Sequence, residues 1–281
     1  MKIIECPRDA MQGITEFIPT QLKAEYINLL LQVGFDTIDF GSFVSPKAIP
    51  QMRDTAELLP LLQLHNSKSH LLAIVANTRG AAEAAAFEEI SYLGFPLSVS
   101  ENFQQRNTNK SIAEALRSVA EIQEICAQKN KKQVVYLSMA FGNPYGDPFE
   151  EAIVIEMTEQ LQRMGVEVVS LSDTIGSSEP TLIKSLYRSV KQAFPSLELG
   201  LHLHSTPEKT HEKIEAALEV ACERIDGALK GFGGCPMAKE ELTGNIATEK
   251  IIDFVNEKQA FSSIKADKLA EALLFANQIF H

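Results

Sequence analysis

Short apolar segments alternate with longer amphipathic segments along almost the whole chain, and this alternation restricts the fold more than any other feature. A short apolar run bounded by turn residues is typical of a buried strand, whereas apolar residues at helical spacing indicate a helix. The expected strands are Lys2–Cys6, Thr37–Phe40, His70–Val75, Leu97–Val99, Val134–Ser138, Val166–Leu171, Leu197–Leu203 and Ile225–Leu229. The expected helices are Gln21–Val33, Ile49–Leu59, Arg79–Tyr92, Ser111–Lys129, Pro148–Met164, Ser178–Ala193, Pro207–Glu223, Ala247–Asn256 and Ala266–Ile279.

Eight strands that are each followed by a helix predict an α/β fold of the (β/α)8 TIM-barrel type, here with an extra C-terminal helix. An open doubly wound sheet also alternates, but it usually carries a glycine-rich phosphate-binding turn after its first strand. In this chain the first turn is Pro-Arg-Asp-Ala-Met-Gln at 7–12, and neither a GxGxxG nor a Walker A sequence occurs. The barrel is therefore the preferred prediction.

Length and composition narrow the class of protein further. The 281 residues contain no Ser/Gly/Pro linker and no charge block, so we expect one domain over residues 1–281. A net charge of -11 without a basic cluster argues against nucleic acid as a partner. The four cysteines show no CxxC spacing, no signal or transit peptide is recognisable, and no apolar stretch is long enough to span a membrane. We therefore expect a cytoplasmic protein with no membrane partner.

Polar residues stand just after most of the expected strands. Barrel enzymes build their active sites at the C-terminal ends of the strands, so these residues should converge on one mouth. Taken singly, each could instead be a turn residue or a helix cap. The set includes Arg8, Asp9, Gln12, Asp39, Ser42, Asn143, Asp173, His202, His204 and Cys235.

His202 and His204 stand two apart in the apolar run Leu-Glu-Leu-Gly-Leu-His-Leu-His. Residues i and i+2 of a strand point to the same side, so both imidazoles would face one place, as a metal pair or a catalytic pair. The alternative is two polar residues on a half-exposed strand. With Asp9 and Asn245 the donors are all nitrogen and oxygen, which favours octahedral Mg²⁺ or Mn²⁺, although ligand type alone leaves Zn²⁺ open. Arg8 would supply a fixed cation for an anionic oxygen.

Cys235 lies in the turn-rich run Gly-Phe-Gly-Gly-Cys-Pro, which favours an exposed and mobile thiol. Such a thiol becomes an acid, base or nucleophile when neighbouring positive charge draws its pKa toward neutrality. The other three cysteines, Cys6, Cys126 and Cys222, are expected to be structural. Cys126 and Cys222 stand in helical patterns, where a small buried hydrophobe is the expected role.

Seven segments of the chain resemble the 3-hydroxy-3-methylglutaryl-CoA lyase family, part of a superfamily of metal-dependent lyases and Claisen-condensing barrels. Ser-Phe-Val-Ser-Pro-Lys at 42–47 and Gly-Gly-Cys-Pro at 233–236 are typical of the lyase branch, whereas Arg-Asp and His-x-His also occur in the condensing enzymes. The matching segments are 7–12, 42–52, 98–103, 171–176, 201–204, 233–236 and 244–249.

The resemblance implies a retro-Claisen cleavage of 3-hydroxy-3-methylglutaryl-CoA to acetoacetate and acetyl-CoA, as in leucine degradation, by a homodimer that uses Mg²⁺ or Mn²⁺. The implied metal ligands are Asp9, His202, His204 and Asn245. Arg8 would stabilise the enolate, Asp39 stands where the family has a glutamate, and Cys235 would be the mobile thiol. His202 and Asp173 would assist proton transfer. The expected substrate contacts are Gln12, Ser42, Lys47 and Asn143.

Three departures from the family pattern keep other functions open. Ala10 follows Arg-Asp where the family usually has glycine, and Ser205 follows His-x-His where it usually has aspartate. The segment from Cys235 to Asn245 is one residue longer than usual and has lost a glycine. One alternative is a Claisen-type acyltransferase that condenses acetyl-CoA with a 2-oxo acid, and another is a metal- and acyl-CoA-binding homologue with little turnover.

Overall fold

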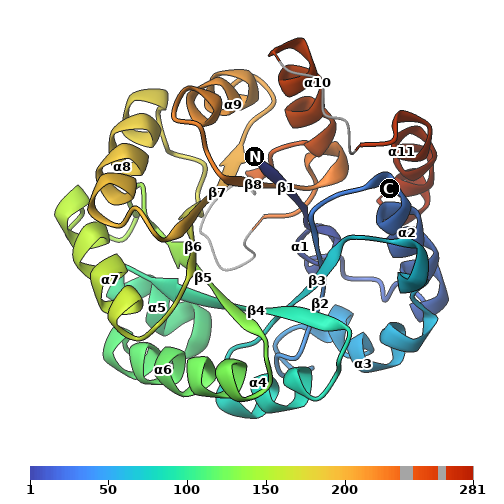
Figure 1. Ribbon diagram of the computed structural model, residues 1–281, viewed down its shortest axis with the longest axis horizontal. Coiled ribbons are helices and arrows are strands. Elements are labelled where there is room, and N and C mark those ends of the chain that lie inside the picture. The colour runs from blue at the N-terminus through green and yellow to red at the C-terminus, as the bar shows by residue number, and fades with distance from the viewer. Residues whose placement is uncertain (235–242, 259–263, 281) are drawn as a thin grey trace.

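The computed structural model describes residues 1–234, 243–258 and 264–280. Within these residues, eight parallel strands pair in the order β6-β5-β4-β3-β2-β1-β8-β7, and β6 also pairs with β7. That last pairing closes the sheet into a barrel, which a ring of helices surrounds (Figure 1). The prediction of a (β/α)8 TIM barrel is confirmed.

The barrel strands are β1 (Lys2–Glu5), β2 (Thr37–Ser42), β3 (His70–Ile74), β4 (Ile90–Ser98), β5 (Lys132–Ser138), β6 (Val168–Asp173), β7 (Glu198–Ser205) and β8 (Arg224–Gly227). A short strand, β9 (Gly244–Asn245), pairs antiparallel with β7. The α-helices are α1 (Pro7–Gln12), α2 (Thr20–Val33), α3 (Thr55–Leu58), α4 (Thr78–Ala85), α5 (Glu101–Thr108), α6 (Ile112–Gln128), α7 (Glu151–Arg163), α8 (Pro180–Ala193), α9 (Thr210–Glu219), α10 (Thr248–Lys258) and α11 (Ala266–Ile279).

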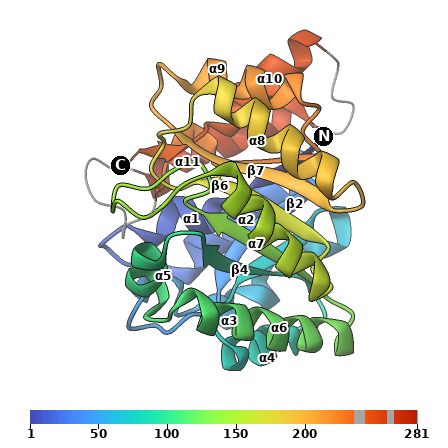
Figure 2. The same cartoon turned by 90° about the vertical axis from the view of Figure 1, so that its left-hand side faces the viewer.

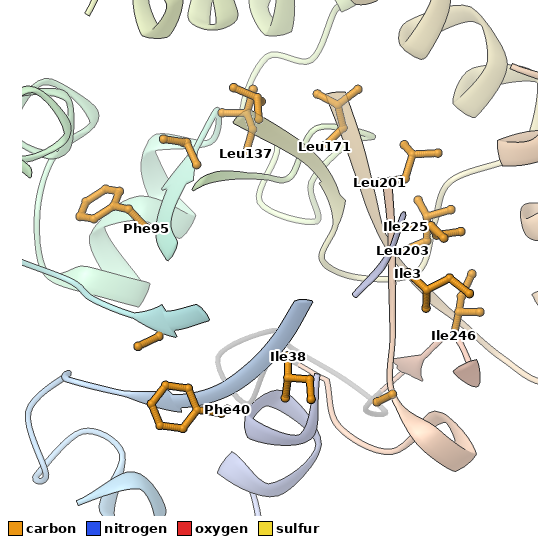
Figure 3. Packing of buried hydrophobic residues seen from close by; sticks show 14 of the residues in the cluster. Ile3, Ile38, Phe40, Phe95, Leu137, Leu171, Leu201, Leu203, Ile225 and Ile246 are labelled. Atoms are coloured by element: carbon orange, nitrogen blue, oxygen red, sulfur yellow. The ribbon is translucent and has the colours of Figure 1, made fainter. Parts of the chain in front are cut away.

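The main hydrophobic core lies between the strand ring and the helices. Figure 3 shows Phe40, Phe95, Leu171 and Leu201 pointing from their strands into this layer, and all four are fully buried. Each such side chain contributes about 1.5–3 kcal/mol when it is removed from water. The alternate residues of the strands point inward, so most strand residues are buried on both faces of the sheet.

A second, smaller cluster fills the barrel interior. It contains Leu72, Tyr92, Val134, Tyr136 and Val168. Two glycines make room for large side chains here. A Cβ on Gly94 would lie 3.1 Å from the ring of Tyr136, and a Cβ on Gly200 would lie 2.5 Å from Cγ of the buried Arg224.

Three expected elements were wrong in their bounds. The helix expected over Arg79–Tyr92 ends at Ala85, and β4 begins at Ile90, seven residues before the strand expected at Leu97–Val99. Glycine and proline are unusual inside a strand, so Gly94 and Pro96 prevented the sequence pattern from indicating the first part of β4. The structure explains both residues, because Gly94 accommodates Tyr136 and Pro96 lines a cavity. The helix expected over Ile49–Leu59 is instead divided into Pro50–Met52, α3 and Leu59–Leu61.

Two short helices that were not expected follow β1 and β4. In α1, Pro7 occupies the first turn, where its missing N–H costs nothing. The chain therefore turns immediately after β1, and this turn directs Arg8 and Asp9 toward the barrel mouth. In α5, the Ser100 side chain accepts a hydrogen bond from Phe103 N and caps the helix.

The C-terminal helix α11 is additional to the eight repeats and lies against α2 (Figures 1 and 2). The ring of Tyr26 stacks on Phe275 at 6.2 Å between centroids and meets Phe280 edge-on at 6.0 Å. The Lys265 N–H donates to the carbonyl of Val33 at the end of α2. The extra C-terminal helix expected from the sequence is present.

Candidate active site

A cavity of about 500 Å³ opens at the C-terminal ends of the strands. Because parallel strands all end at one rim, polar residues that are distant in sequence meet there. Seven of the predicted site residues line this cavity: Arg8, Asp9, Gln12, Asp39, Ser42, His202 and His204. Tyr136, Ser138, Ser172 and Thr174 add hydroxyl groups to the lining.

Asp9, His202 and His204 form a group able to hold a metal ion, because one donor atom of each lies within 4.8 Å of the others. The two imidazoles lie on the same side of β7, with 5.1 Å between ring centroids. His204 Nδ1 lies 3.1 Å from the Thr174 carbonyl, so Nδ1 carries the proton and Nε2 keeps its lone pair. Nε2 is buried and has no hydrogen-bond partner among the described residues. An orphaned buried lone pair beside a carboxylate fits a bound cation.

Asn245 reaches this group from β9. Its Nδ2 donates to Asp9 Oδ2 at 2.7 Å and to the Phe232 carbonyl at 2.9 Å, so the amide nitrogen faces Asp9. A Cβ on Gly233 would lie 2.6 Å from this nitrogen, and Gly233 has a φ of +100°. Only glycine therefore permits the close approach of the two segments.

Arg8 bridges two carboxylates at the base of the cavity. Its Nε donates to Asp39 Oδ2 at 3.0 Å, and its Nη1 donates to Asp9 at 3.0 Å and to Gln12 at 2.9 Å. Burial raises the pKa of Asp39 to about 6, although Arg8 opposes this shift. Burial also disfavours the Asp9 carboxylate, but Arg8 and the two imidazoles outweigh it and lower the pKa of Asp9 to about 2. Asp9 is therefore ionised and available to a cation at neutral pH.

The two histidines differ in environment. His202 Nδ1 lies 3.1 Å from Oδ2 of Asp226, a buried residue of β8. Burial lowers the pKa of His202, but Asp226 and Asp9 outweigh burial and raise it. Burial and the neighbouring His202 lower the pKa of His204 to about 4, so His204 is neutral at pH 7.

Sequence reasoning missed Asp226, although a signal was present. It is an acidic residue inside the short buried strand Arg-Ile-Asp-Gly, where a carboxylate needs a partner. Carboxylates that hold the far nitrogen of a metal-binding histidine fix its tautomer and its orientation. Phe17 and Arg53, at the rim of the cavity, were also missed, and the Arg53 guanidinium stacks 3.6 Å above the Phe17 ring.

Among the described residues, four of the predicted site residues do not line the cavity: Asn245, Asp173, Lys47 and Asn143. Asp173 lies behind His204 and accepts hydrogen bonds from Ser177 N, from Ser178 and from the buried Lys213 at 2.7 Å. Lys213 also donates to the His204 carbonyl, so this pair supports β7.

Lys47 is exposed, and Asn143 holds its own loop through Tyr145 N and Asp147. Cys235 lies outside the described residues.

A (β/α)8 barrel with a carboxylate, two imidazoles and a fixed arginine at its C-terminal mouth defines a class, the barrel enzymes with a metal-binding mouth. Within that class, the chain belongs to the family described as HMGL-like, which matches residues 2–275.

Individual relatives are consistent with this assignment. The mitochondrial hydroxymethylglutaryl-CoA lyase of Mus musculus is 33% identical over 97% of this chain and 83% of the relative. The crystal structure of the Bacillus subtilis HMG-CoA lyase has a TM-score of 0.91 and 30% identity, covering 99% of this chain and 92% of the other. An HMG-CoA lyase from Acinetobacter baumannii, solved in complex with coenzyme A and 3-methylmalate, has a TM-score of 0.91 and 30% identity. It covers 99% of this chain and 90% of the other.

Proposed function

We propose that this chain is a carbon–carbon lyase that cleaves 3-hydroxy-3-methylglutaryl-CoA to acetoacetate and acetyl-CoA. The observation that carries the proposal is the group formed by Asp9, His202 and His204 beside Arg8, in a barrel whose relatives are named for this reaction. The relative solved with coenzyme A supports an acyl-CoA substrate.

The residues that would hold the metal are Asp9, His202 and His204, joined by Asn245. A divalent cation, Mg²⁺ or Mn²⁺, supplies positive charge that polarises the substrate hydroxyl and a neighbouring carbonyl or carboxylate oxygen. All four side chains offer nitrogen or oxygen donors, which suits these two ions. The unpartnered Nε2 of His204 and the ionised Asp9 favour this role.

Arg8 would stabilise the negative charge that moves onto the thioester oxygen as the C2–C3 bond breaks. Its guanidinium is buried, permanently charged and fixed in place by Asp39 and Asp9. A cation that is oriented before the reaction needs no rearrangement when charge develops, so it lowers the barrier rather than improving ground-state binding.

The reaction removes a proton from the C3 hydroxyl and later returns a proton to the enolate carbon. Asp39 is the candidate acceptor for the first transfer, because it lines the cavity and its pKa is about 6. His202 would assist this transfer as a metal ligand, since Asp226 engages its Nδ1. We assign the second transfer to the Cys235 thiol, on the resemblance of its sequence segment. Asp173 would act through the position of His204, since Lys213 and the Ser177–Ser178 turn already engage its carboxylate.

Gln12 and Ser42 line the cavity, which supports their assignment as substrate contacts. The contacts of Lys47 and Asn143 lend no support to a substrate role for those two residues. Among the described residues, no helix is long and apolar enough to cross a membrane. A homodimer, a cytoplasmic location and a place in leucine degradation stay predictions from the sequence.

One assay separates the candidate functions. The protein is incubated with Mg²⁺ and 3-hydroxy-3-methylglutaryl-CoA, and acetoacetate and acetyl-CoA are quantified together. Equimolar release of both supports the lyase. Release of free coenzyme A from acetyl-CoA and a 2-oxo acid, without cleavage, would instead establish the condensing acyltransferase, which the names of the relatives do not favour. Metal binding without either product would establish the weakly active homologue.

A further inference from the structure

A second group of possible metal donors lies in the barrel interior beneath the mouth. One donor atom each of Cys6, His202 and Asp226 lies within 4.8 Å of the others. The register of the strands explains the grouping, because β8 pairs with β1 on one side and with β7 on the other. Asp226 stands opposite Ile4 on β1 and opposite His202 on β7. Cys6 follows β1 directly, and its thiol is buried.

The donor atoms of this group are poorly satisfied by the protein itself. Asp226 is 1% exposed, and its Oδ1 has no hydrogen-bond partner among the described residues. Its Oδ2 meets His202 Nδ1 at 3.1 Å, and the Cys6 thiol makes a long contact of 3.9 Å to the Ile4 carbonyl. A buried carboxylate oxygen without a donor is rare in folded proteins and points to a missing cation or water.

The local charge also favours a cation. Asp9, Asp39 and Asp226 bring three carboxylates to this part of the barrel, with Glu5 as a fourth acidic group, against the two cations Arg8 and Arg224. Burial, followed by the carboxylates of Asp226 and Asp39, raises the pKa of the Cys6 thiol well above its usual value. The negative charge of the carboxylates disfavours a thiolate but attracts a divalent ion. An ion that binds the sulfur displaces the thiol proton.

We propose that Cys6, Asp226 and Nδ1 of His202 form a site for a thiophilic divalent cation such as Zn²⁺ or Cd²⁺. A sulfur donor together with one imidazole and one carboxylate suits these ions and disfavours Mg²⁺. When the ion binds, the proton of the Cys6 thiol passes to water. The imidazole proton moves from Nδ1 to Nε2 through solvent.

This proton shift connects the inner site to the mouth. With its proton on Nε2, His202 can no longer donate a lone pair to the group formed with Asp9 and His204. The inner ion therefore removes one donor from the mouth group and inhibits the enzyme, although the two sites do not share a donor atom. The inhibition rests on the proposed function, whereas the binding of the ion does not.

The binding is tested by titrating the protein with Cd²⁺ and recording the ultraviolet thiolate-to-metal charge-transfer band. A Cys235→Ser background removes another thiol that could bind Cd²⁺. We expect one Cd²⁺ per chain with this band, loss of the band in Cys6→Ser and in Cys6→Ala, and its persistence in Cys222→Ser. Cys222 is the matched control, because it is also a buried cysteine but is absent from the group. A band that survives both Cys6 variants, or no band in the parent protein, overturns the proposal.

The inhibition is tested in the chain with Cys235 intact. At a fixed Mg²⁺ concentration, Cys6→Ser should raise the Zn²⁺ concentration for half-inhibition by at least about 100-fold, since even loss of an outer partner weakens metal binding ~10–100-fold. Cys222→Ser should leave that concentration unchanged. Equal Zn²⁺ sensitivity of the parent and Cys6→Ser would overturn the link between the sites. A protein without lyase activity that still shows the Cys6-dependent Cd²⁺ band would refute the proposed function alone.

Discussion

Replacement of Arg8 by glutamine tests how the site stabilises developing charge. The guanidinium donates to Asp39 through Nε and to both Asp9 and Gln12 through Nη1, and Arg8 is only 9% exposed. Arg8→Gln removes the charge between two buried carboxylates and shortens the side chain, so both bridges are lost. The pKa of Asp39, which is about 6 although Arg8 holds it down, should then rise further.

Two separate magnitudes follow for Arg8→Gln. Leaving a buried partner charge uncompensated costs about 3–5 kcal/mol of folding stability. Loss of one oriented donor to the reacting oxygen costs about 2.7–4 kcal/mol in the barrier, which lowers kcat by about 10²–10³. Affinity for the metal should hold or increase, because Asp9 loses the Arg8 Nη1 hydrogen bond that competes with a cation. The stability and the kcat of Arg8→Lys should lie between those of the parent protein and those of Arg8→Gln, because lysine restores the charge but cannot bridge both carboxylates.

The assay measures three quantities on each variant: unfolding in guanidinium chloride, kcat for acetoacetate release, and Mn²⁺ affinity by electron paramagnetic resonance. The loss of folding stability and the loss of kcat should differ between the two variants. Relative to Arg8→Gln, Arg8→Lys should recover a larger share of the stability than of kcat. A variant that folds less stably but keeps kcat within a factor of a few would show that Arg8 is structural. A fall in Mn²⁺ affinity equal to the fall in kcat would refute the role assigned to its charge.

Three further predictions follow from the site and its surroundings. His204→Ala should weaken Mn²⁺ binding by at least about 100-fold. His211→Ala, on α9 and away from the mouth, is the control and should leave Mn²⁺ affinity unchanged. Equal Mn²⁺ affinities of the two variants would refute the ligand set. Cys235→Ser should abolish most turnover while the metal stays bound, and near-normal turnover would move the second proton transfer to another group. Burial raises the pKa of Glu5 from 4.5 to about 8, so its contribution to stability is present below the unfolded value and lost as pH rises through about 8. Glu5→Gln keeps partners for both hydrogen bonds. It should remove up to about 5 kcal/mol of the pH dependence of the free energy of unfolding, measured in urea. Parallel pH profiles for Glu5→Gln and the parent protein would contradict this prediction.

Much of the barrel could be predicted because its strands are buried on both faces and its helices carry a helical period. Failures occurred where tertiary packing outweighs local preference. Gly94 and Pro96 made β4 hard to recognise as a strand from the sequence. Gly94 is required by packing in the barrel interior, and Pro96 lines the cavity at the mouth. The helix α1 escaped detection because six residues are too few to show a period, yet it directs Arg8 and Asp9 into the cavity.

The site was predictable to the extent that strand ends mark it. Asp9, His202 and His204 follow from the barrel rule and the spacing of two, and the structure brings their donor atoms together. Asp226 stands inside a strand of four residues, opposite His202 on β7, so a search of strand ends passes over it. The environment of Asp173 depends on the buried Lys213, a residue forty positions away in the sequence, and no local pattern indicates that contact.

Asp9, His202 and His204 are proposed to hold the divalent cation to which the substrate binds. Anomalous diffraction from a crystal grown with Mn²⁺ tests this claim most directly. We expect one strong peak at the barrel mouth, at about 2.0–2.3 Å from a carboxylate oxygen of Asp9 and from one nitrogen of each histidine. A peak elsewhere, or a well-ordered mouth without any peak at saturating Mn²⁺, would contradict the claim.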